Sequence, residues 1–388
     1  MNDESIPLVL VGYPFVAYAR GWTTISFFRS FQTINQKAFV CDVFSHQEKK
    51  RPMDIAIESE LEGVLVSRPG SGINIYHLNG DEIDISLARL QHRLPDGAYN
   101  IVYPFWELSK YPAPWAEKLK LFDEIWAPSQ FIHNALEKSV KKPIVHMPLP
   151  VELKFSTFMG RQDFGFPESS FLFLSFLDFR SYVDRKNPFA SIEVFEKICE
   201  SKPFADVQLV LKFHGGKDSS NAQAGCQRFL ERIHQSPFAN QIILVDRILS
   251  ENEVKNLIRC CDCFISLHRS EGFGLVMAEA MYLAKPVIAT AYSSNIDFMD
   301  EQTAYMVNYK LIPVGVEQYP YADGQVWADP DVEKAAEFAL KLLDNPASGR
   351  GIEQRASQRI RTHFSYLAMG LRYKQRIDTI ISKKGMAP

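Results

Sequence analysis

Residues 263–280, CFISLHRSEGFGLVMAEA, indicate the fold more clearly than any other stretch of this chain. The apolar run at residues 263–267 is typical of a buried strand, and the residues after Gly274 are good helix formers. Gly272 and Gly274 let the backbone between them approach a ligand closely. The unpaired amides at a helix start attract anions. The stretch therefore predicts a strand, a glycine turn and a helix that together bind an anion.

Two glutamates flank this turn, and seven residues separate Glu271 from Glu279. Glu271 falls in the predicted loop, whereas Glu279 falls about two turns down the helix. Both carboxylates are candidates for binding a ligand at the mouth of a cleft. The alternative is structural, with Glu271 stabilising the positive end of the helix dipole and Glu279 solvated on the helix surface.

The composition favours two globular domains and excludes some partners. The chain has 388 residues, of which 46% are hydrophobic, and single domains usually contain about 100–200 residues. The net charge of −3, with both signs interspersed, offers no field suited to nucleic acid. An anionic ligand must therefore be bound by a local pocket.

Strand-like and helical segments alternate through both halves, which predicts two successive α/β domains. The first half includes a helix whose core face carries Ile25, Phe27, Phe28, Phe31 and Ile34. The periodicity stops between prolines at residues 146–151, which indicates the connection between domains. Near the end, two helices are expected, with a break at residues 364–365. The expected strands lie at residues 7–11, 38–43, 74–76, 101–103, 124–127, 171–177, 207–211, 241–244, 263–267 and 286–289.

The termini and cysteines indicate a reduced, cytoplasmic protein. The first five residues are acidic, which makes a poor signal peptide, and no apolar run reaches the roughly 20 residues that span a bilayer. Six cysteines are scattered, and the cluster Cys260, Cys261 and Cys263 is expected to pack as small apolar groups without zinc. The last helix interleaves apolar and basic residues, so weak peripheral contact with the inner face of a membrane is the alternative.

A basic loop follows the strand at residues 171–177. Arg180, Arg185 and Lys186 lie there, at the end of a strand where open α/β sheets bind ligands. Lys212, near the end of the next strand, is a weaker candidate. Fixed cations of this kind can stabilise a departing diphosphate without a metal. Arg185 could instead be the surface member of this run. The alternative for the whole loop is a solvated cluster.

Other motifs give less support to competing chemistry. Asp329 and Asp331 match the D-x-D pattern of metal-dependent transferases, but Asp331 precedes a helix, so a helix cap explains it more simply. We therefore expect no metal cofactor. No dinucleotide-binding, Walker or serine-nucleophile motif is present, so hydride transfer, nucleotide hydrolysis and esterase activity lose support.

The glutamate spacing and the basic loop resemble those of family-4-type (group 1) retaining glycosyltransferases, which build bacterial surface polysaccharides. Residues 12–21, 105–108, 123–129 and 266–274 resemble the same family, so the likeness extends over nearly the whole chain. It implies a GT-B fold: two Rossmann-like domains facing each other across a cleft, at residues 1–148 and 149–365. The C-terminal helix, at about residues 366–388, would return to the first domain.

The resemblance also implies roles for individual residues. The first domain would bind a glycan or lipid-linked glycan acceptor, and the second a nucleoside-diphosphate sugar. Arg180 and Lys186 would hold the diphosphate, Glu271 the sugar and Glu279 the ribose. The backbone amides of Gly272, Phe273 and Gly274 would contact the sugar or phosphate. A mannosyltransferase is favoured on resemblance only, and a catalytically silent sugar-nucleotide or glycan-binding subunit is the alternative.

Two segments depart from the family pattern. Many relatives have a glycine pair in the loop after the first strand, where this chain has Tyr18, Ala19 and Arg20 before Gly21. Gly21 would still allow a close approach. Many relatives also place a catalytic histidine after a strand of the first domain, and here either His77 or Asn79 falls at that place. Glu107 is a third candidate, unless its carboxylate only braces Trp106.

Overall fold

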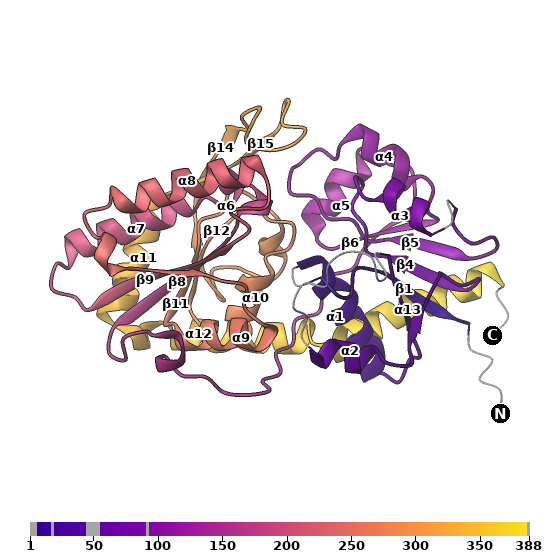
Figure 1. Cartoon of the computed structure of the whole chain (residues 1–388), viewed down its shortest axis with the longest axis horizontal. Coiled ribbons are helices and arrows are strands. Elements are labelled where there is room, and N and C mark those ends of the chain that lie inside the picture. Colours follow the sequence, from indigo (N-terminus) through magenta and orange to yellow (C-terminus); the bar gives the residue numbers. More distant parts are fainter. Residues whose placement is uncertain (1–5, 17–18, 44–54, 91–92, 386–388) are drawn as a thin grey trace. The chain divides into compact units, whose positions relative to one another are not determined.

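The computed structural model describes residues 6–16, 19–43, 55–90 and 93–385, and these form two compact units (Figure 1). The first unit joins the chain up to Glu152 to the segment from Thr362 onwards, and the second runs from Leu153 to Arg361. Residues 1–5, Tyr18 and residues 386–388, which the sequence analysis interpreted, lie outside the described residues.

The described part of unit 1 contains a seven-stranded parallel sheet in the order β3-β2-β1-β4-β5-β6-β7. The strand β1 lies between β2 and β4, with Val9 opposite Phe39 and Asn74. Parallel strands need crossover connections, and helices supply most of them here. The strands are β1 (Leu8–Gly12), β2 (Phe39–Asp42), β3 (Leu65–Val66), β4 (Ile73–Tyr76), β5 (Tyr99–Val102), β6 (Glu124–Ala127) and β7 (Ile144–His146), and the helices of the same region are α1 (Ala19–Thr33), α2 (Ile55–Leu61), α3 (Ile83–Arg89), α4 (Ala113–Leu119) and α5 (Gln130–Glu137).

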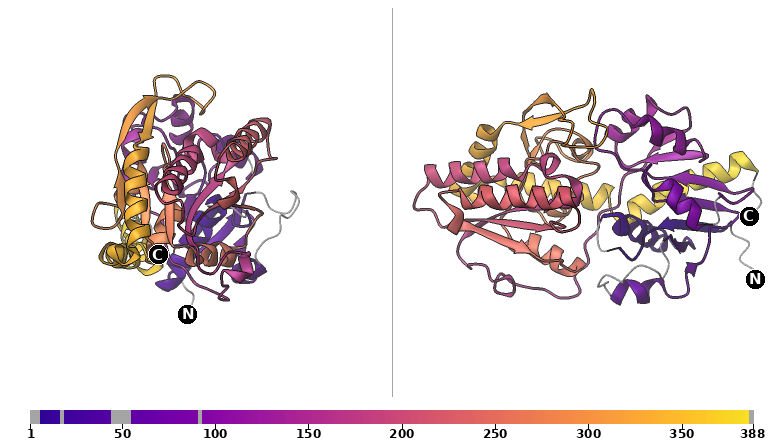
Figure 2. Two further views of the ribbon diagram at one scale, coloured as in Figure 1. Left: turned by 90° about the vertical axis from the view of Figure 1, so that its left-hand side faces the viewer. Right: turned by 45° about the horizontal axis from the view of Figure 1, so that its top comes forward.

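The C-terminal helix α13 (Tyr366–Lys384) packs on α1 within unit 1, as expected (Figures 1 and 2). The ring of Tyr373 stacks on Phe27 with centroids 4.2 Å apart. A side chain at Gly370 would lie 2.4 Å from the carbonyl oxygen of Ser30, so glycine allows this close helix contact. Ile377 and Ile380 of this helix are buried, whereas Leu371 is exposed.

Local hydrogen bonds explain where the units divide. The amide of Val151 donates to Phe364, and the amide of Tyr366 donates to the Glu152 carboxylate. These bonds tie residues 151–152 to the start of α13, so unit 1 extends to Glu152. The break between the last two helices falls where the sequence predicts it, because α12 (Arg350–His363) ends before Ser365 caps α13.

Unit 2 has, in its described residues, a six-stranded parallel sheet in the order β10-β9-β8-β11-β12-β13 and a two-stranded antiparallel sheet, β14-β15. The second sheet and β13 were not predicted from the sequence. The parallel strands are β8 (Phe171–Asp178), β9 (Val207–His214), β10 (Ile242–Asp246), β11 (Cys263–Ser266), β12 (Val287–Thr290) and β13 (Tyr305–Val307); the antiparallel pair is β14 (Tyr309–Pro313) and β15 (Val326–Pro330); the main helices are α6 (Val183–Lys186), α7 (Pro188–Ser201), α8 (Ser220–His234), α9 (Glu251–Cys260), α10 (Leu275–Tyr282) and α11 (Val332–Asp344).

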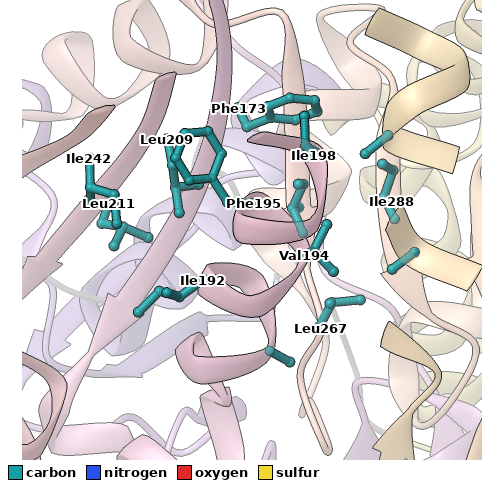
Figure 3. Packing of buried hydrophobic residues seen from close by; sticks show 14 of the residues in the cluster. Phe173, Ile192, Val194, Phe195, Ile198, Leu209, Leu211, Ile242, Leu267 and Ile288 are labelled. Atoms are coloured by element: carbon teal, nitrogen blue, oxygen red, sulfur yellow. The ribbon is translucent and has the colours of Figure 1, made fainter. Parts of the chain in front are cut away.

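A hydrophobic core lies beneath this sheet and fixes the strand ends that carry the candidate site. Side chains from α7, including Val194 and Phe195, pack on Phe173 of β8 and Leu209 of β9 (Figure 3). Leu267, directly after β11, belongs to the same cluster. The loops after β8 and β11 therefore leave a rigid sheet at its carboxyl edge, where ligands of parallel sheets bind.

No helix among the described residues is both long and apolar enough to cross a membrane.

Candidate active site

Glu271 and Lys186 meet directly, although 85 residues separate them in the chain. Lys186 Nζ lies 2.5 Å from Glu271 Oε1, and Arg185 Nη1 lies 3.3 Å from Glu271 Oε2. Glu271 is only 8% exposed. Burial alone would raise the pKa of Glu271, but Lys186 and then Arg185 lower it to about 2. The carboxylate is therefore ionised and held between two cations.

Arg185 corrects one expectation, because it is not a surface residue. It is 3% exposed, and its guanidinium donates to the carbonyl oxygens of Ser181 and Ser270. Asn187, two residues after Arg185, donates to the carbonyl of Leu267. These bonds join the loop after β8 to the loop after β11. The basic loop is thus held by specific hydrogen bonds and is not a solvated cluster.

The glycine turn has the predicted form. Gly274 caps α10 with a φ of 93°, a left-handed conformation that favours glycine. A side chain there would lie 2.5 Å from Met277 Cε. Gly272 is buried, and the ring of Phe273 packs on Phe298 with centroids 5.2 Å apart. The Phe273 ring is therefore packed in the interior of unit 2.

Glu279 is buried in α10 and is not the solvated helix residue of the structural alternative. It is 6% exposed, and burial raises its pKa to about 8. Lys255 of α9 lowers that pKa and Glu251 raises it. Lys255 is itself buried and bonds to Glu251 and to the carbonyl of Lys154. A buried carboxyl group with so few compensating charges is typical of a functional site.

Arg180 lies in a separate charged group. Its Nε is 3.0 Å from Asp178 Oδ1, and His214 Nε2 is 3.3 Å from Asp178 Oδ2. Burial would raise the pKa of Asp178, yet His214 and Arg180 hold it well below its usual range. Lys212 lies within β9, where burial lowers its pKa to about 8 and its Nζ donates to the Phe213 carbonyl.

His268 lies beside Glu271 and is a further candidate that the sequence did not indicate. It is fully buried, and its Nε2 lies 3.1 Å from Asn295 Oδ1. Burial lowers its pKa, and the nearby Glu271 acts in the opposite direction. Ser293 was also missed, and its hydroxyl accepts from the Glu271 amide at 2.8 Å. His268 stands in the quoted stretch 263–280, but nothing in that stretch indicates Ser293 or Asn295.

In unit 1, His77 follows β4 and is buried. Burial lowers its pKa to about 3, so the imidazole is neutral. Neither ring nitrogen has a hydrogen-bond partner among the described residues, and the ring packs edge-on against Phe27. The Oδ1 atom of Asn79 accepts from the Phe105 amide at 2.9 Å.

Two further candidates lie in unit 1. Glu107 is half-buried, and the Trp106 indole donates to the carbonyl of Lys110. Gly21 lies in the first turn of α1, where a side chain would be 2.1 Å from the Val16 carbonyl oxygen. The close approach that this glycine allows is therefore to the chain's own backbone.

The D-x-D pattern is explained by local structure. Asp331 caps α11 by accepting from the amide of Lys334, as predicted. Asp329 lies 3.6 Å from Arg269. Cys260, Cys261 and Cys263 are buried free thiols, and burial raises the pKa of each.

Comparison with known families supplies the identification. The profile of the family "Glycosyl transferases group 1" matches residues 161–359, just over half of the chain. This chain belongs to that family. The matched segment contains the basic loop, the glycine turn and both glutamates described above.

Sequence relatives are distant and longer. The chain is 24% identical over 179 residues to alpha-1,3/1,6-mannosyltransferase ALG2 of Dictyostelium discoideum, covering 45% of this chain and 36% of that protein. It is 26% identical over 181 residues to a trehalose synthase of Pyrococcus horikoshii, covering 46% and 37%. The chain thus matches little more than a third of the length of these relatives.

Solved structures confirm the GT-B fold. Sucrose-phosphate synthase from Thermosynechococcus elongatus matches with a TM-score of 0.70 at 13% identity, covering 98% of this chain and 100% of that one. Anabaena Alr3699/HepE in complex with UDP and glucose matches with a TM-score of 0.64 at 10% identity, covering 97% and 100%. At these identities the likeness concerns the fold.

Proposed function

We propose that this chain is a retaining, metal-independent glycosyltransferase that moves a sugar from a nucleoside-diphosphate sugar to a hydroxyl of a glycan or lipid-linked glycan. The product would be a surface polysaccharide. The observation that carries the proposal is the buried contact of Glu271 with Lys186 and Arg185, beside the glycine turn that opens α10. Family membership supports it, because the matched segment contains all of these residues.

The proposed chemistry depends on stabilising the negative charge that develops on the leaving diphosphate. When the bond from sugar to diphosphate breaks, negative charge develops on the phosphate, and preorganised cations and amides stabilise it. Lys186 and the amides at the start of α10 would do so here, with Arg180 oriented by Asp178. Glu271, kept ionised, would accept hydrogen bonds from the sugar hydroxyls. No residue of the site is an evident nucleophile, so we propose that the acceptor attacks the face that the diphosphate leaves.

The two remaining ligand contacts are assigned by burial. Glu279 would accept hydrogen bonds from the ribose. Among His77, Asn79 and Glu107, the histidine is favoured as the group that contacts the reacting sugar, because its neutral ring can both donate to and accept from a hydroxyl. A mannosyl donor is favoured by the similarity to ALG2, although the trehalose synthase relatives and the HepE complex direct attention to glucosyl donors as well.

A donor scan tests the function. Hydrolysis and transfer are measured with UDP-, GDP- and dTDP-sugars, beginning with GDP-mannose and UDP-glucose. A transferase releases nucleoside diphosphate from one donor class, and Lys186→Ala abolishes that release, whereas Lys197→Ala on the surface of α7 does not. Tight donor binding without any turnover, with or without glycan acceptors, would instead identify a silent binding subunit.

A further inference from the structure

Tyr182 has a backbone conformation that tyrosine rarely adopts. Its φ is 63° and its ψ is 117°, which lies outside the ordinary left-handed helical region. Residues in such conformations persist only where their surroundings hold them, and they gather at functional sites. Tyr182 directly precedes α6, the single turn that carries Arg185 and Lys186. The strained residue therefore sets the direction in which both cations leave the sheet.

One side chain from a distant segment contacts this strained residue. Tyr319, in the connection between β14 and β15, packs edge-to-face on Tyr182 with ring centroids 5.0 Å apart. The Arg185 guanidinium lies 6.0 Å from the centre of the same Tyr319 ring. Tyr319 is only 7% exposed. It thus touches both the strained residue and the buried cation next to Glu271.

The β14–β15 hairpin is fastened to the same loop through Arg269. The amide of Ala328 in β15 donates to the Arg269 carbonyl, and the Arg269 amide donates to the Arg185 carbonyl at 2.8 Å. Arg269 Nη1 also donates to the Asp184 carbonyl, and its guanidinium lies 5.5 Å from the Trp327 ring. These bonds connect the hairpin that carries Tyr319 to the loop that carries Arg185.

We propose that Tyr319 is a positioning residue for Lys186, the cation that the proposed function assigns to the diphosphate. It holds Tyr182 in its unusual conformation and thereby fixes where α6 places Arg185 against Glu271 and presents Lys186 to the ligand. The inference rests on the proposed function of that site. Its physical basis is that α6 is one helical turn, so a change of φ at Tyr182 would swing both cations together.

Calorimetric binding to the full chain tests this role. UDP and GDP are compared with UMP and GMP, because only the diphosphates need the full set of cations. We expect Tyr319→Ala to weaken binding of the diphosphate about tenfold, the order that an aromatic pair contributes, and that of the monophosphate less than about twofold. Tyr319→Phe keeps the ring and should stay near wild type. Val316→Ala, in the same connection but 89% exposed, is the matched control.

A double-mutant cycle separates positioning from general packing. Tyr182→Gly removes the cost of the positive φ at position 182, since glycine adopts positive φ freely. In that background, Tyr319→Ala should have little further effect on diphosphate binding. Additive effects, or equal losses for monophosphate and diphosphate, would overturn the inference. A wild-type chain that binds no nucleoside diphosphate overturns the proposed function and the inference with it, whereas unchanged affinity in Tyr319→Ala beside a binding wild type overturns the inference alone.

Discussion

Glu271 is a buried anion whose two cationic partners come from another loop, and this makes its substitution informative. Glu271→Gln should lower transfer about 10²- to 10³-fold, because a charge aimed at the reacting sugar is lost. It should also lower the melting temperature, since Arg185 then lies buried without its carboxylate partner. From the sequence alone an unchanged melting temperature is expected. Initial rates and thermal melts check both effects.

The matched control for this substitution is Glu193→Gln on the exposed face of α7, which should change neither rate nor melting. Transfer at the wild-type rate in Glu271→Gln would refute the role of this residue.

The raised pKa of Glu279 predicts that the stability of the folded chain depends on pH. Its pKa rises from an ordinary value near 4.5 to about 8 in the folded state, mainly through burial, with Lys255 opposing and Glu251 adding to the shift. The folded chain therefore holds a proton that the unfolded chain releases, so stability falls as pH rises from about 4.5 to about 8. The slope is about 1.4 kcal/mol per pH unit.

Urea unfolding of wild type and Glu279→Gln at pH 6 and pH 8 isolates this effect from other titrating groups. The wild type should lose more stability than the variant between the two pH values. Parallel curves would show that Glu279 keeps an ordinary pKa.

At the scale of elements, substitution of the residue that caps α11 tests whether Asp331 is a structural residue or a metal ligand. Asp331→Ala should cost about 1 kcal/mol of stability, because the Lys334 amide loses its acceptor. Transfer by the folded variant should remain, and wild-type transfer should persist in EDTA. A complete loss in EDTA that magnesium restores would mean that Asp329 and Asp331 hold a metal.

Another element, α13, is anchored within unit 1 by an ion pair. The Arg376 guanidinium forms two contacts with Glu124, which is fully buried and also accepts from Tyr99 and Trp126. Arg376→Gln should destabilise the chain by about 3 kcal/mol, because a buried carboxylate loses its only cation in the described structure. Lys374→Gln on the same helix breaks an exposed pair with Asp378 and should cost less than about 0.5 kcal/mol. Denaturant titrations compare the two.

At the scale of the whole molecule, the predicted behaviour toward membranes follows from the same packing. The apolar residues Ile377 and Ile380 are buried in unit 1, and Arg376 is paired with Glu124. The exposed large apolar side chains of α13 are Leu367 and Leu371, which form too small an apolar face to insert the helix into lipid. Co-sedimentation with anionic vesicles should be weak and should disappear at high salt. Binding that survives high salt would contradict this prediction and make α13 a membrane anchor.

Local sequence determined much of this protein. Periodicity located most strands of both parallel sheets, Ser250 and Glu253 form a capping box at the start of α9, and Gly274 opens α10 as expected. These features depend on neighbouring residues, whose preferences are readable in the chain. The short strands β3, β7 and β13 carry too few residues to show a period.

Tertiary structure alone decided which charges meet. The spacing of Arg180 and Lys186 gave no sign that Arg185 would be buried against Glu271, or that Arg180 would pair with Asp178. Nor did it show that Tyr319 would reach Tyr182. Burial and pairing of charged residues that are far apart in the sequence depend on how the sheets bring their loops together. A buried charge is stable only where a side chain from another element pairs with it. The sequence thus determined the elements, and their packing determined the site.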